Sequence, residues 1–212
     1  MNIVLMGCPG AGKGTQSVKL QQEFNLHHIS TGDVLRAEIA SGSVLGKQIA
    51  AIIDKGNLVP DEMMISMLEN NVKSTDKGII FDGFPRTVAQ AQALDAMMCR
   101  LHRQITHVVM IELSEEEAVL RITSRKQCKK CGEILHIDAK NPLTKCPVCG
   151  GELYSRPDDT PQRAKHRFDV YRQETLPVKN YYHSRGKYVE INRNHTPQKV
   201  FEDIEKSLQK DK

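Results

Sequence analysis

The chain has 212 residues, of which 39% are hydrophobic and 26% are charged. This composition is typical of a globular protein with a substantial core, and it excludes a wholly disordered chain. No apolar run approaches the roughly 18 residues of a membrane span, and the apolar N-terminal stretch has no basic lead, so we predict a cytoplasmic protein without signal peptide or membrane partner. A net charge of +4 is too small to indicate a nucleic-acid partner.

Short apolar runs with the length of buried strands recur along the chain, at residues 2–6, 79–82, 107–113 and 188–191. The first run ends in a glycine-rich turn that leads into the helical pattern of residues 15–24. A further strand is expected near residues 27–29, whose two histidines we interpret as structural. Ser114, Thr160 and Thr196 have the sequence context of helix N-caps. Because strands separated by helices need crossover connections, the pattern predicts an α/β fold with a parallel sheet.

Two segments depart from this alternation. Residues 126–159 are rich in cysteine, lysine, glycine and proline and have no helical periodicity, which indicates an inserted lobe. Residues 31–59 have a helical pattern that glycines interrupt, and they lie between predicted strands. We therefore expect one α/β domain that carries two additional lobes.

The strongest motif is the run GCPGAGKGT at residues 7–15, between a predicted strand and a predicted helix. Glycines allow backbone N–H groups to curl around phosphate oxygens, the helix N-terminus adds a positive dipole, and Lys13 can reach the β and γ phosphates. The run differs from the common GxxxxGK[ST] pattern because Gly14 follows the lysine and the hydroxyl comes at Thr15. It predicts a phosphate-binding loop, with a purely structural turn as the alternative.

A carboxylate ends the second apolar run. Asp82 follows three apolar residues and precedes a glycine, so it lies at the end of a predicted buried strand. Beside a phosphate loop, such a carboxylate is suited to the Mg²⁺ of a bound triphosphate. Without the loop, a helix cap or a turn residue would be the simpler interpretation.

Four of the six cysteines form two CxxC pairs, at Cys128, Cys131, Cys146 and Cys149. Each pair turns two thiolates toward one point, and the four together complete a tetrahedral site, which predicts structural zinc. Disulfides or idle thiols are the alternatives. His136 lies between the pairs, and we interpret it as a surface residue because the four sulfurs already saturate the ion. Cys8 lies inside the predicted phosphate loop, where a small side chain fits, and Cys99 falls in a helical pattern and is interpreted as an ordinary core thiol.

The loop, the segment from Ser30 to Asp33 with Arg36, and the segment from Asp82 to Arg86 with Gln90 form a combination that resembles the adenylate kinase family. The resemblance extends over essentially the whole chain, and its cysteine pairs resemble the long, zinc-bearing lids of that family. It implies a three-layer fold around a five-stranded parallel sheet. The implied division is a core (1–29, 60–125 and 160–212), a mobile helical AMP-binding lobe (30–59) and a zinc lid (126–159).

The resemblance also implies roles for individual residues. The implied AMP site consists of Thr31, Arg36, Asn57, Leu58, Val59, Gly83, Phe84, Pro85, Arg86, Gln90, Arg156 and Arg167. The implied ATP site consists of Gly10, Ala11, Gly12, Lys13, Gly14, Thr15, Arg121, Arg125, Ile134, Leu135 and Asn194. The implied catalytic residues are Lys13, Asp82, Arg86, Arg125, Arg156 and Arg167.

The implied activity is the reversible reaction of ATP and AMP to two ADP, with Mg²⁺ bound to ATP and a monomeric enzyme. A monophosphate is already largely ionised at neutral pH, so no general base is required. Arginines are needed instead, because guanidinium groups bind phosphate oxygens in pairs. A lobe must also close over the site, since water would otherwise compete as acceptor.

Other functions stay open at this point. A kinase of the same fold could use another nucleoside monophosphate, because the base pocket cannot be predicted from spacing. An ATPase whose zinc ribbon binds nucleic acid would explain the lysines of residues 126–145 but not the motifs at residues 30–36 and 82–86. The stretch Thr160 to Ala164 lacks the acidic and β-branched residues that relatives commonly carry there.

Overall fold

The computed structural model describes residues 1–55, 57–137, 142–192 and 196–209, and these residues form an α/β fold on one parallel sheet. The strands of this sheet are β1 (Asn2–Gly7), β2 (His27–Ser30), β3 (Ile79–Asp82), β4 (His107–Glu112) and β8 (Tyr188–Asn192). They pair in the order β2-β3-β1-β4-β8, and every pair is parallel. The predicted fold class is therefore confirmed, and each predicted apolar run coincides with a strand to within one residue at either end.

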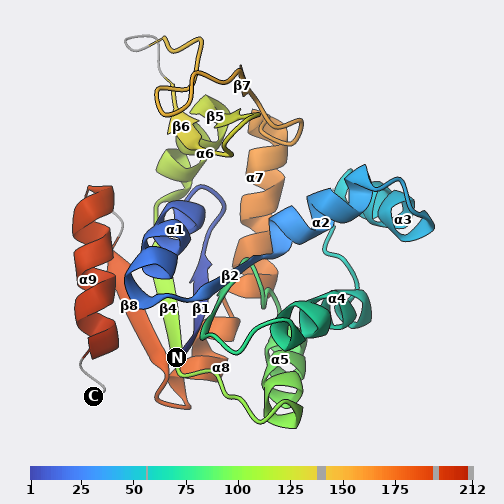
Figure 1. Ribbon diagram of the computed structural model, residues 1–212, viewed down its shortest axis with the longest axis vertical. Helices are drawn as coiled ribbons and strands as arrows, with labels where there is room; N and C mark the ends of the chain where they lie inside the picture. Colours follow the sequence, from blue (N-terminus) through green and yellow to red (C-terminus); the bar gives the residue numbers. More distant parts are fainter. Residues whose placement is uncertain (56, 138–141, 193–195, 210–212) are drawn as a thin grey trace.

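Helices cover both faces of the sheet (Figure 1). They are α1 (Lys13–Phe24), α2 (Thr31–Ala40), α3 (Val44–Ile53), α4 (Asp61–Lys73), α5 (Val88–Arg100), α6 (Glu115–Ser124), α7 (Pro161–Val170), α8 (Val178–His183) and α9 (Pro197–Gln209), with a π-helical turn at Tyr171–Thr175. The helices α1 and α9 pack on one face, whereas α4, α5 and α8 pack on the other. The result is the three-layer arrangement that the resemblance implied.

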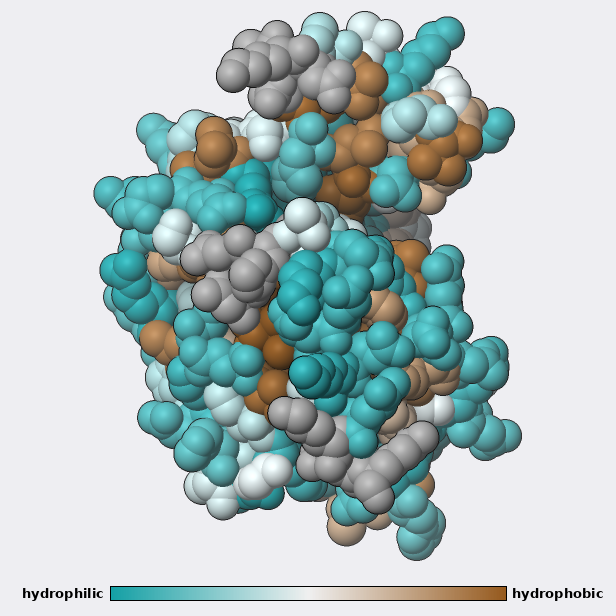
Figure 2. All heavy atoms as spheres, turned by 90° about the vertical axis from the view of Figure 1, so that its left-hand side faces the viewer, coloured by the Kyte–Doolittle hydropathy of each residue, from teal (hydrophilic) through white to brown (hydrophobic). Residues whose placement is uncertain are grey.

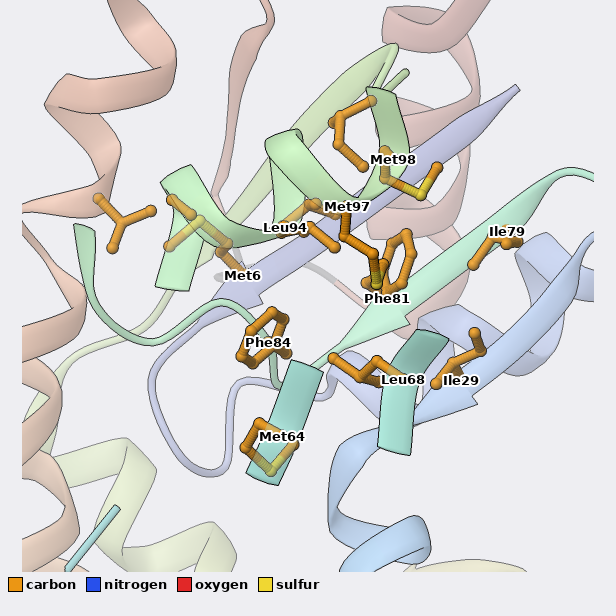
Figure 3. Packing of buried hydrophobic residues seen from close by; sticks show 14 of the residues in the cluster. Met6, Ile29, Met64, Leu68, Ile79, Phe81, Phe84, Leu94, Met97 and Met98 are labelled. Carbon is orange, nitrogen blue, oxygen red and sulfur yellow. The ribbon is translucent and has the colours of Figure 1, made fainter. Parts of the chain in front are cut away.

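Successive side chains of β1 point to opposite faces of the sheet, and the core therefore consists of two hydrophobic clusters, one on each face. Val4 and Met6 pack with α4, α5 and α8, whereas Ile3 and Leu5 face α1 and α9. Figure 3 shows the first cluster, in which Phe81 of β3 lies against methionines of α5. Every residue of β1 is buried, as expected for the central strand of a parallel sheet covered on both faces.

Local sequence signals explain where the helices begin. The hydroxyl oxygens of Ser114 and Thr160 accept hydrogen bonds from backbone N–H groups three residues further on, each at 3.3 Å, and Thr196 does so at 3.2 Å. These three predicted N-caps are confirmed. Helix α1 begins at Lys13, two residues earlier than the predicted pattern, because Gly12 adopts a left-handed conformation with φ of 89° and ends the loop there.

Residues 126–159, here called the cysteine lobe, lie above the sheet in Figure 1, beyond α6 and α7. A small antiparallel sheet in the order β6-β5-β7 consists of β5 (Arg125–Cys128), β6 (Ile134–His136) and β7 (Leu153–Tyr154). The sequence pattern did not predict these strands, because they are short and only partly buried. Among the described residues of the lobe, only Cys128 and Cys146 are buried.

Residues 30–59, here called the helical lobe, contain α2 and α3. A side chain at Gly46 would place its Cβ 2.3 Å from the backbone oxygen of Glu38, so the glycine allows the two helices to approach closely. The interruption at Gly46 is therefore a packing requirement between two short helices, whereas Gly42 has a φ of 70° and open space around it.

The surface carries mainly polar side chains on the face that includes α9 (Figure 2). Within the described residues, no helix has the length and apolar character needed to cross a membrane. One predicted core residue is wrong: Cys99 is exposed near the end of α5, because its neighbours Met97 and Met98 occupy the buried face. Cys8, within the phosphate loop, is buried.

Candidate functional site

The predicted phosphate loop joins the carboxyl end of β1 to the N-terminus of α1. Gly7, Gly10 and Gly12 all have positive φ angles, which side chains rarely adopt. A Cβ at Gly10 would also lie 2.8 Å from the backbone oxygen of Ala118, so the loop packs directly on α6. These constraints explain the glycines and leave the first N–H groups of α1 directed into the loop, where they suit an anion.

Lys13 lies at the first position of α1, over the start of the loop. Its ammonium group donates hydrogen bonds to the backbone oxygens of Gly7 at 2.8 Å and Cys8 at 3.0 Å. Burial lowers the pKa of Lys13, and the nearby Asp82 carboxylate opposes that change. The lysine is thus a largely desolvated cation at the mouth of the loop.

Asp82 ends β3, the strand beside β1, and its side chain is 12% exposed. A Cβ at Gly14 would lie 3.9 Å from Asp82 Oδ2, so the carboxylate borders the phosphate loop. His28 of β2 places its Nε2 atom 3.4 Å from the same oxygen. A carboxylate at this position, adjoining a phosphate loop, fits a site for a nucleotide-bound Mg²⁺ ion.

A cavity of about 430 Å³ opens between the helical lobe, the carboxyl end of β3 and α7. Ten of the twelve residues implied for AMP line it, namely Thr31, Arg36, Asn57, Leu58, Val59, Gly83, Phe84, Arg86, Gln90 and Arg167. The other two do not: Pro85 lines a second, smaller cavity, and Arg156 lines neither. Sequence motifs far apart in the chain are thus brought together around one space.

Hydrogen bonds hold the polar wall of this cavity in place. Gln90 is 2% exposed, and its Oε1 atom accepts from the Arg86 backbone N–H at 2.7 Å while its Nε2 atom donates to Asp61 at 2.7 Å. Arg86 donates from Nε to the backbone oxygen of Gly83 at 2.8 Å. Burial, followed by the repulsion of Arg167, lowers the pKa of Arg86 to about 10.

The smaller cavity, about 80 Å³, lies between the phosphate loop and α7. Lys13, Arg86 and Arg167 all line it. It shares Leu58, Gly83, Arg86 and Arg167 with the larger cavity, so the two spaces adjoin. The cationic side chains are therefore concentrated at the boundary between the loop and the larger cavity.

Most of the predicted arginines have a carboxylate partner. The nitrogen–oxygen distances are 2.5 Å for Arg36 and Asp33, 2.6 Å for Arg121 and Glu117, 2.5 Å for Arg125 and Asp159, and 2.7 Å for Arg167 and Asp158. Arg125 binds Asp159 through two nitrogens, and the Asp159 side chain is only 1% exposed. Sequence reasoning used Asp158 and Asp159 only as landmarks, because adjacent acids in an arginine-rich stretch indicate ion pairing without showing which arginine each acid binds.

Arg156 differs from these arginines. Its Nε atom donates to Oε1 of Gln127 at 2.8 Å, and no carboxylate of the described chain forms an ion pair with it. Sequence reasoning gave Gln127 no role, because a lone glutamine between a lysine and a cysteine carries no recognisable signal.

Two of the other residues implied for ATP, Ala11 and Ile134, are located at the loop. Ala11 is buried, and Ile134 of β6 extends toward the loop, since a Cβ at Gly14 would lie 3.7 Å from its Cδ1 atom. Leu135 pairs with Lys126 across β5 and β6. The prediction for Asn194 lies outside the described residues.

The four lobe cysteines converge, with all their Sγ atoms within 4.8 Å of one another. Cys128 and Cys149 are 3.4 Å apart at sulfur, and Cys131 and Cys146 are 3.6 Å apart. A tetrahedral zinc ion with Zn–S distances of about 2.3 Å places its sulfurs about 3.8 Å apart, so the geometry fits. Backbone N–H groups, that of Cys131 foremost, lower the pKa of Cys128 to about 6, whereas at Cys131 the opposing backbone N–H group of Glu133 is outweighed by the contact with Cys149 and by burial, which raise the pKa.

His136 lies outside this cluster. It is exposed, and its Nδ1 atom is 3.1 Å from the backbone oxygen of Arg121. The predicted surface position of this histidine is confirmed.

A parallel α/β sheet with a phosphate loop, a flanking carboxylate and an adjoining cavity lined by arginines defines a phosphotransferase of the P-loop class. The model of the family described as Adenylate kinase matches residues 5–187. A curated protein of Elusimicrobium minutum, named adenylate kinase, is 45% identical to this chain over the full length of both. One of the same name from Archaeoglobus fulgidus is 42% identical over 99% of each chain. A third, from Methanosarcina acetivorans, is 44% identical over 99% of each chain. The chain belongs to the adenylate kinase family.

Proposed function

We propose that this enzyme transfers the γ phosphoryl group of ATP reversibly to AMP, with ATP at the phosphate loop and AMP in the larger cavity. One observation carries the assignment of the two sites: the two cavities share Leu58, Gly83, Arg86 and Arg167. An acceptor phosphate in the larger cavity would therefore reach the same cations as the terminal phosphate of a nucleotide on the loop.

In this proposal the chain's own residues act by position and charge. Lys13 and the loop N–H groups bind the β and γ phosphates, and Arg86 and Arg167 contact the group in transfer. An oxygen of the acceptor phosphate forms the new P–O bond while the bond to the β-phosphate oxygen breaks. No side chain has to remove a proton, because the acceptor is already ionised.

Mg²⁺ bound to ATP would neutralise developing charge on the phosphates, and Asp82 would hold it. The carboxylate is suited to this role because it ends the strand next to β1 and borders Gly14. His28, beside Asp82, would restrict its orientation.

Zinc is proposed for the four cysteines. Four thiolates leave no open coordination position, so the ion would be structural and would hold the cysteine lobe together. We propose that this lobe (126–159) closes as a lid over ATP, that residues 30–59 form the mobile AMP lobe, and that the remaining ranges form the core. A monomer in the cytoplasm is the corresponding expectation for the whole enzyme.

The test is formation of ADP from MgATP with AMP, GMP, CMP and UMP offered separately, and with no acceptor as the hydrolysis control. The proposal predicts rapid turnover with AMP and little hydrolysis without it. Faster turnover with another monophosphate would assign the larger cavity to that nucleotide. Acceptor-independent hydrolysis would contradict the proposal that the lobes exclude water.

A further inference from the structure

Gln127 lies in β5, the middle strand of the cysteine lobe, and its side chain forms three hydrogen bonds. Its Oε1 atom accepts from Arg156 Nε at 2.8 Å and from the Tyr154 hydroxyl at 3.1 Å. Its Nε2 atom donates to the backbone oxygen of Gly132 at 3.3 Å. The guanidinium group of Arg156 can only donate hydrogen bonds, so the amide oxygen of Gln127 must face it. The amide nitrogen of Gln127 then faces Gly132, in the turn of the first CxxC pair.

We propose that Gln127 is a positioning residue, which holds the Arg156 guanidinium group for contact with phosphate oxygens while leaving its charge intact. The inference rests on the proposed catalytic role of Arg156. Gln127 itself would touch no substrate and would act through the arginine.

The choice of an amide rather than a carboxylate is the first argument. Arg36, Arg121, Arg125 and Arg167 each form an ion pair with an aspartate or a glutamate. In the described chain, Arg156 has a neutral acceptor in place of such a partner. An amide oxygen holds a guanidinium group by a weaker hydrogen bond than a carboxylate does, but it does not cancel the positive charge.

The atom that Gln127 binds is the second argument. A bond to Nε fixes the plane of the guanidinium group, and it leaves both terminal nitrogens available. Among the described residues, these terminal nitrogens of Arg156 have no hydrogen-bond partner. Two parallel N–H groups with a fixed plane are the arrangement that binds two phosphate oxygens at once.

The surroundings of Arg156 supply the third argument. Burial is the main cause that lowers its pKa to about 10; the positive charges of Arg125 and Arg36 add to it, and the carboxylates of Asp159 and Asp158 oppose it. Those two carboxylates form their ion pairs with Arg125 and Arg167, so a partly desolvated Arg156 without an ion-pair partner among the described residues is a place where a phosphate group gains binding energy. Arg36 comes from the helical lobe, so this cluster lies where the two lobes face each other.

The link to Gly132 suggests why the amide comes from β5. Gln127 precedes Cys128, and Gly132 follows Cys131, so the amide bridges the first CxxC turn and Arg156. The orientation of Arg156 would then depend on the folded state of the cysteine lobe. An unbranched side chain such as methionine would keep the packing while it removes these hydrogen bonds.

A double-mutant cycle tests the proposal. The variants are Q127M, R156A, the double variant and Q127E, with S155A as the matched control, because Ser155 forms a neighbouring contact to β5 that does not involve Arg156. Steady-state rates with saturating MgATP and AMP give kcat and KM for each, alongside zinc content and thermal midpoint.

We expect Q127M to lower kcat roughly tenfold with KM changed less than twofold, since hydrogen bonds to charged groups are worth more than neutral ones. Q127E should lower kcat as well, although its shape is nearly unchanged, because it neutralises Arg156. S155A should be within twofold of the parent. In the R156A background, Q127M should have almost no further effect, since coupled residues are not additive.

The cycle also separates the possible failures. Full activity of R156A would overturn the proposed role of Arg156 and this inference with it. A strong effect of R156A together with an additive effect of Q127M would overturn the inference alone, because Gln127 would then act independently of the arginine. Loss of zinc or of thermal stability in both Q127M and Q127E, in proportion to the lost activity, would indicate a purely structural role and would also overturn it.

Discussion

The core and the cysteine lobe are held together by different forces. Two large hydrophobic clusters enclose the five-stranded sheet, and β1 is buried along its whole length. In the described part of the cysteine lobe, Cys128 and Cys146 are the only buried hydrophobic residues, and the other buried side chain, Asp159, is charged. Apolar burial therefore stabilises the core, whereas the described part of the lobe buries too little apolar surface to be stabilised in that way, and the zinc ion proposed for its four cysteines would supply the missing stability.

Because the core and the lobe are stabilised in different ways, the lobe could move without a loss of stability in the core. A lobe that the proposed zinc ion holds together internally could move as a unit without the loss of its own structure. The core gives the phosphate loop a rigid base, because the loop packs on α6 at Gly10. The predictions that follow test whether the two regions are independent.

Removal of the proposed zinc ion should have the largest effect on structure and activity. Chelation, or the variant C146S, should abolish the antiparallel sheet of the lobe and the turnover of the enzyme, and leave the five-stranded sheet intact. Hydrogen exchange read by mass spectrometry would detect lost protection in β5 to β7 and retained protection in β1 and β4. C99S is the control, because Cys99 is exposed and outside the quartet. Simultaneous loss of protection in the core strands would contradict the independence of the two regions.

Replacement of the loop lysine should affect chemistry without affecting either region's fold. K13M removes the cation at the loop mouth, and we expect kcat to fall roughly 10³-fold, about 4 kcal/mol of transition-state stabilisation. Zinc content and unfolding by urea should change little. K19M is the matched control on the same helix, since Lys19, among the described residues, donates a hydrogen bond to Gln198 and lies over the ring of Phe201, away from the loop. Near-normal turnover of K13M would exclude the loop as the ATP site.

A cavity in the core should destabilise the sheet and spare the lobe. Leu20 is fully buried in the cluster that contains α1 and α9, so L20A should lower the free energy of unfolding by about 3 kcal/mol. Urea titration measures the loss, and zinc stoichiometry should stay unchanged. V18A is the control on the same helix, because Val18 is 49% exposed. Zinc loss in L20A under native conditions would mean that the lobe depends on the core packing.

The ion pair at the junction of the two regions should have the smallest effect. Asp159 joins the start of α7 to Arg125 of β5, and D159N keeps one acceptor while it removes the charge, so we expect a loss of about 2 kcal/mol. Thermal unfolding measures it. The control is E152Q, whose exposed pair with Lys129 should contribute less than about 1 kcal/mol. Equal effects of the two variants would show that the junction is no stronger than a surface pair.

Elements with a strong local signal could be predicted from the sequence. The apolar run before Asp82 could only be a buried strand, and the hydroxyl caps at Ser114 and Thr160 have the predicted geometry. The strands of the cysteine lobe could not be predicted, because β6 and β7 span three and two residues and have no period to read. Cys99 was assigned to the core because helical periodicity alone does not say which side of a helix faces the sheet.

The sequence by itself determined the chemistry of the site. Glycine spacing, the lysine, the strand-end aspartate and the two CxxC pairs each follow from what a phosphate or a metal requires of neighbouring residues, and such requirements are local. Only the tertiary structure decided how distant groups combine. It paired Arg125 with Asp159 and Arg167 with Asp158, and it gave Arg156 the amide of Gln127 instead. The partners of Arg125 and Arg156 lie far from them in the sequence. The folding of the chain, rather than the spacing of residues, therefore decides which arginine is left without a carboxylate partner among the described residues.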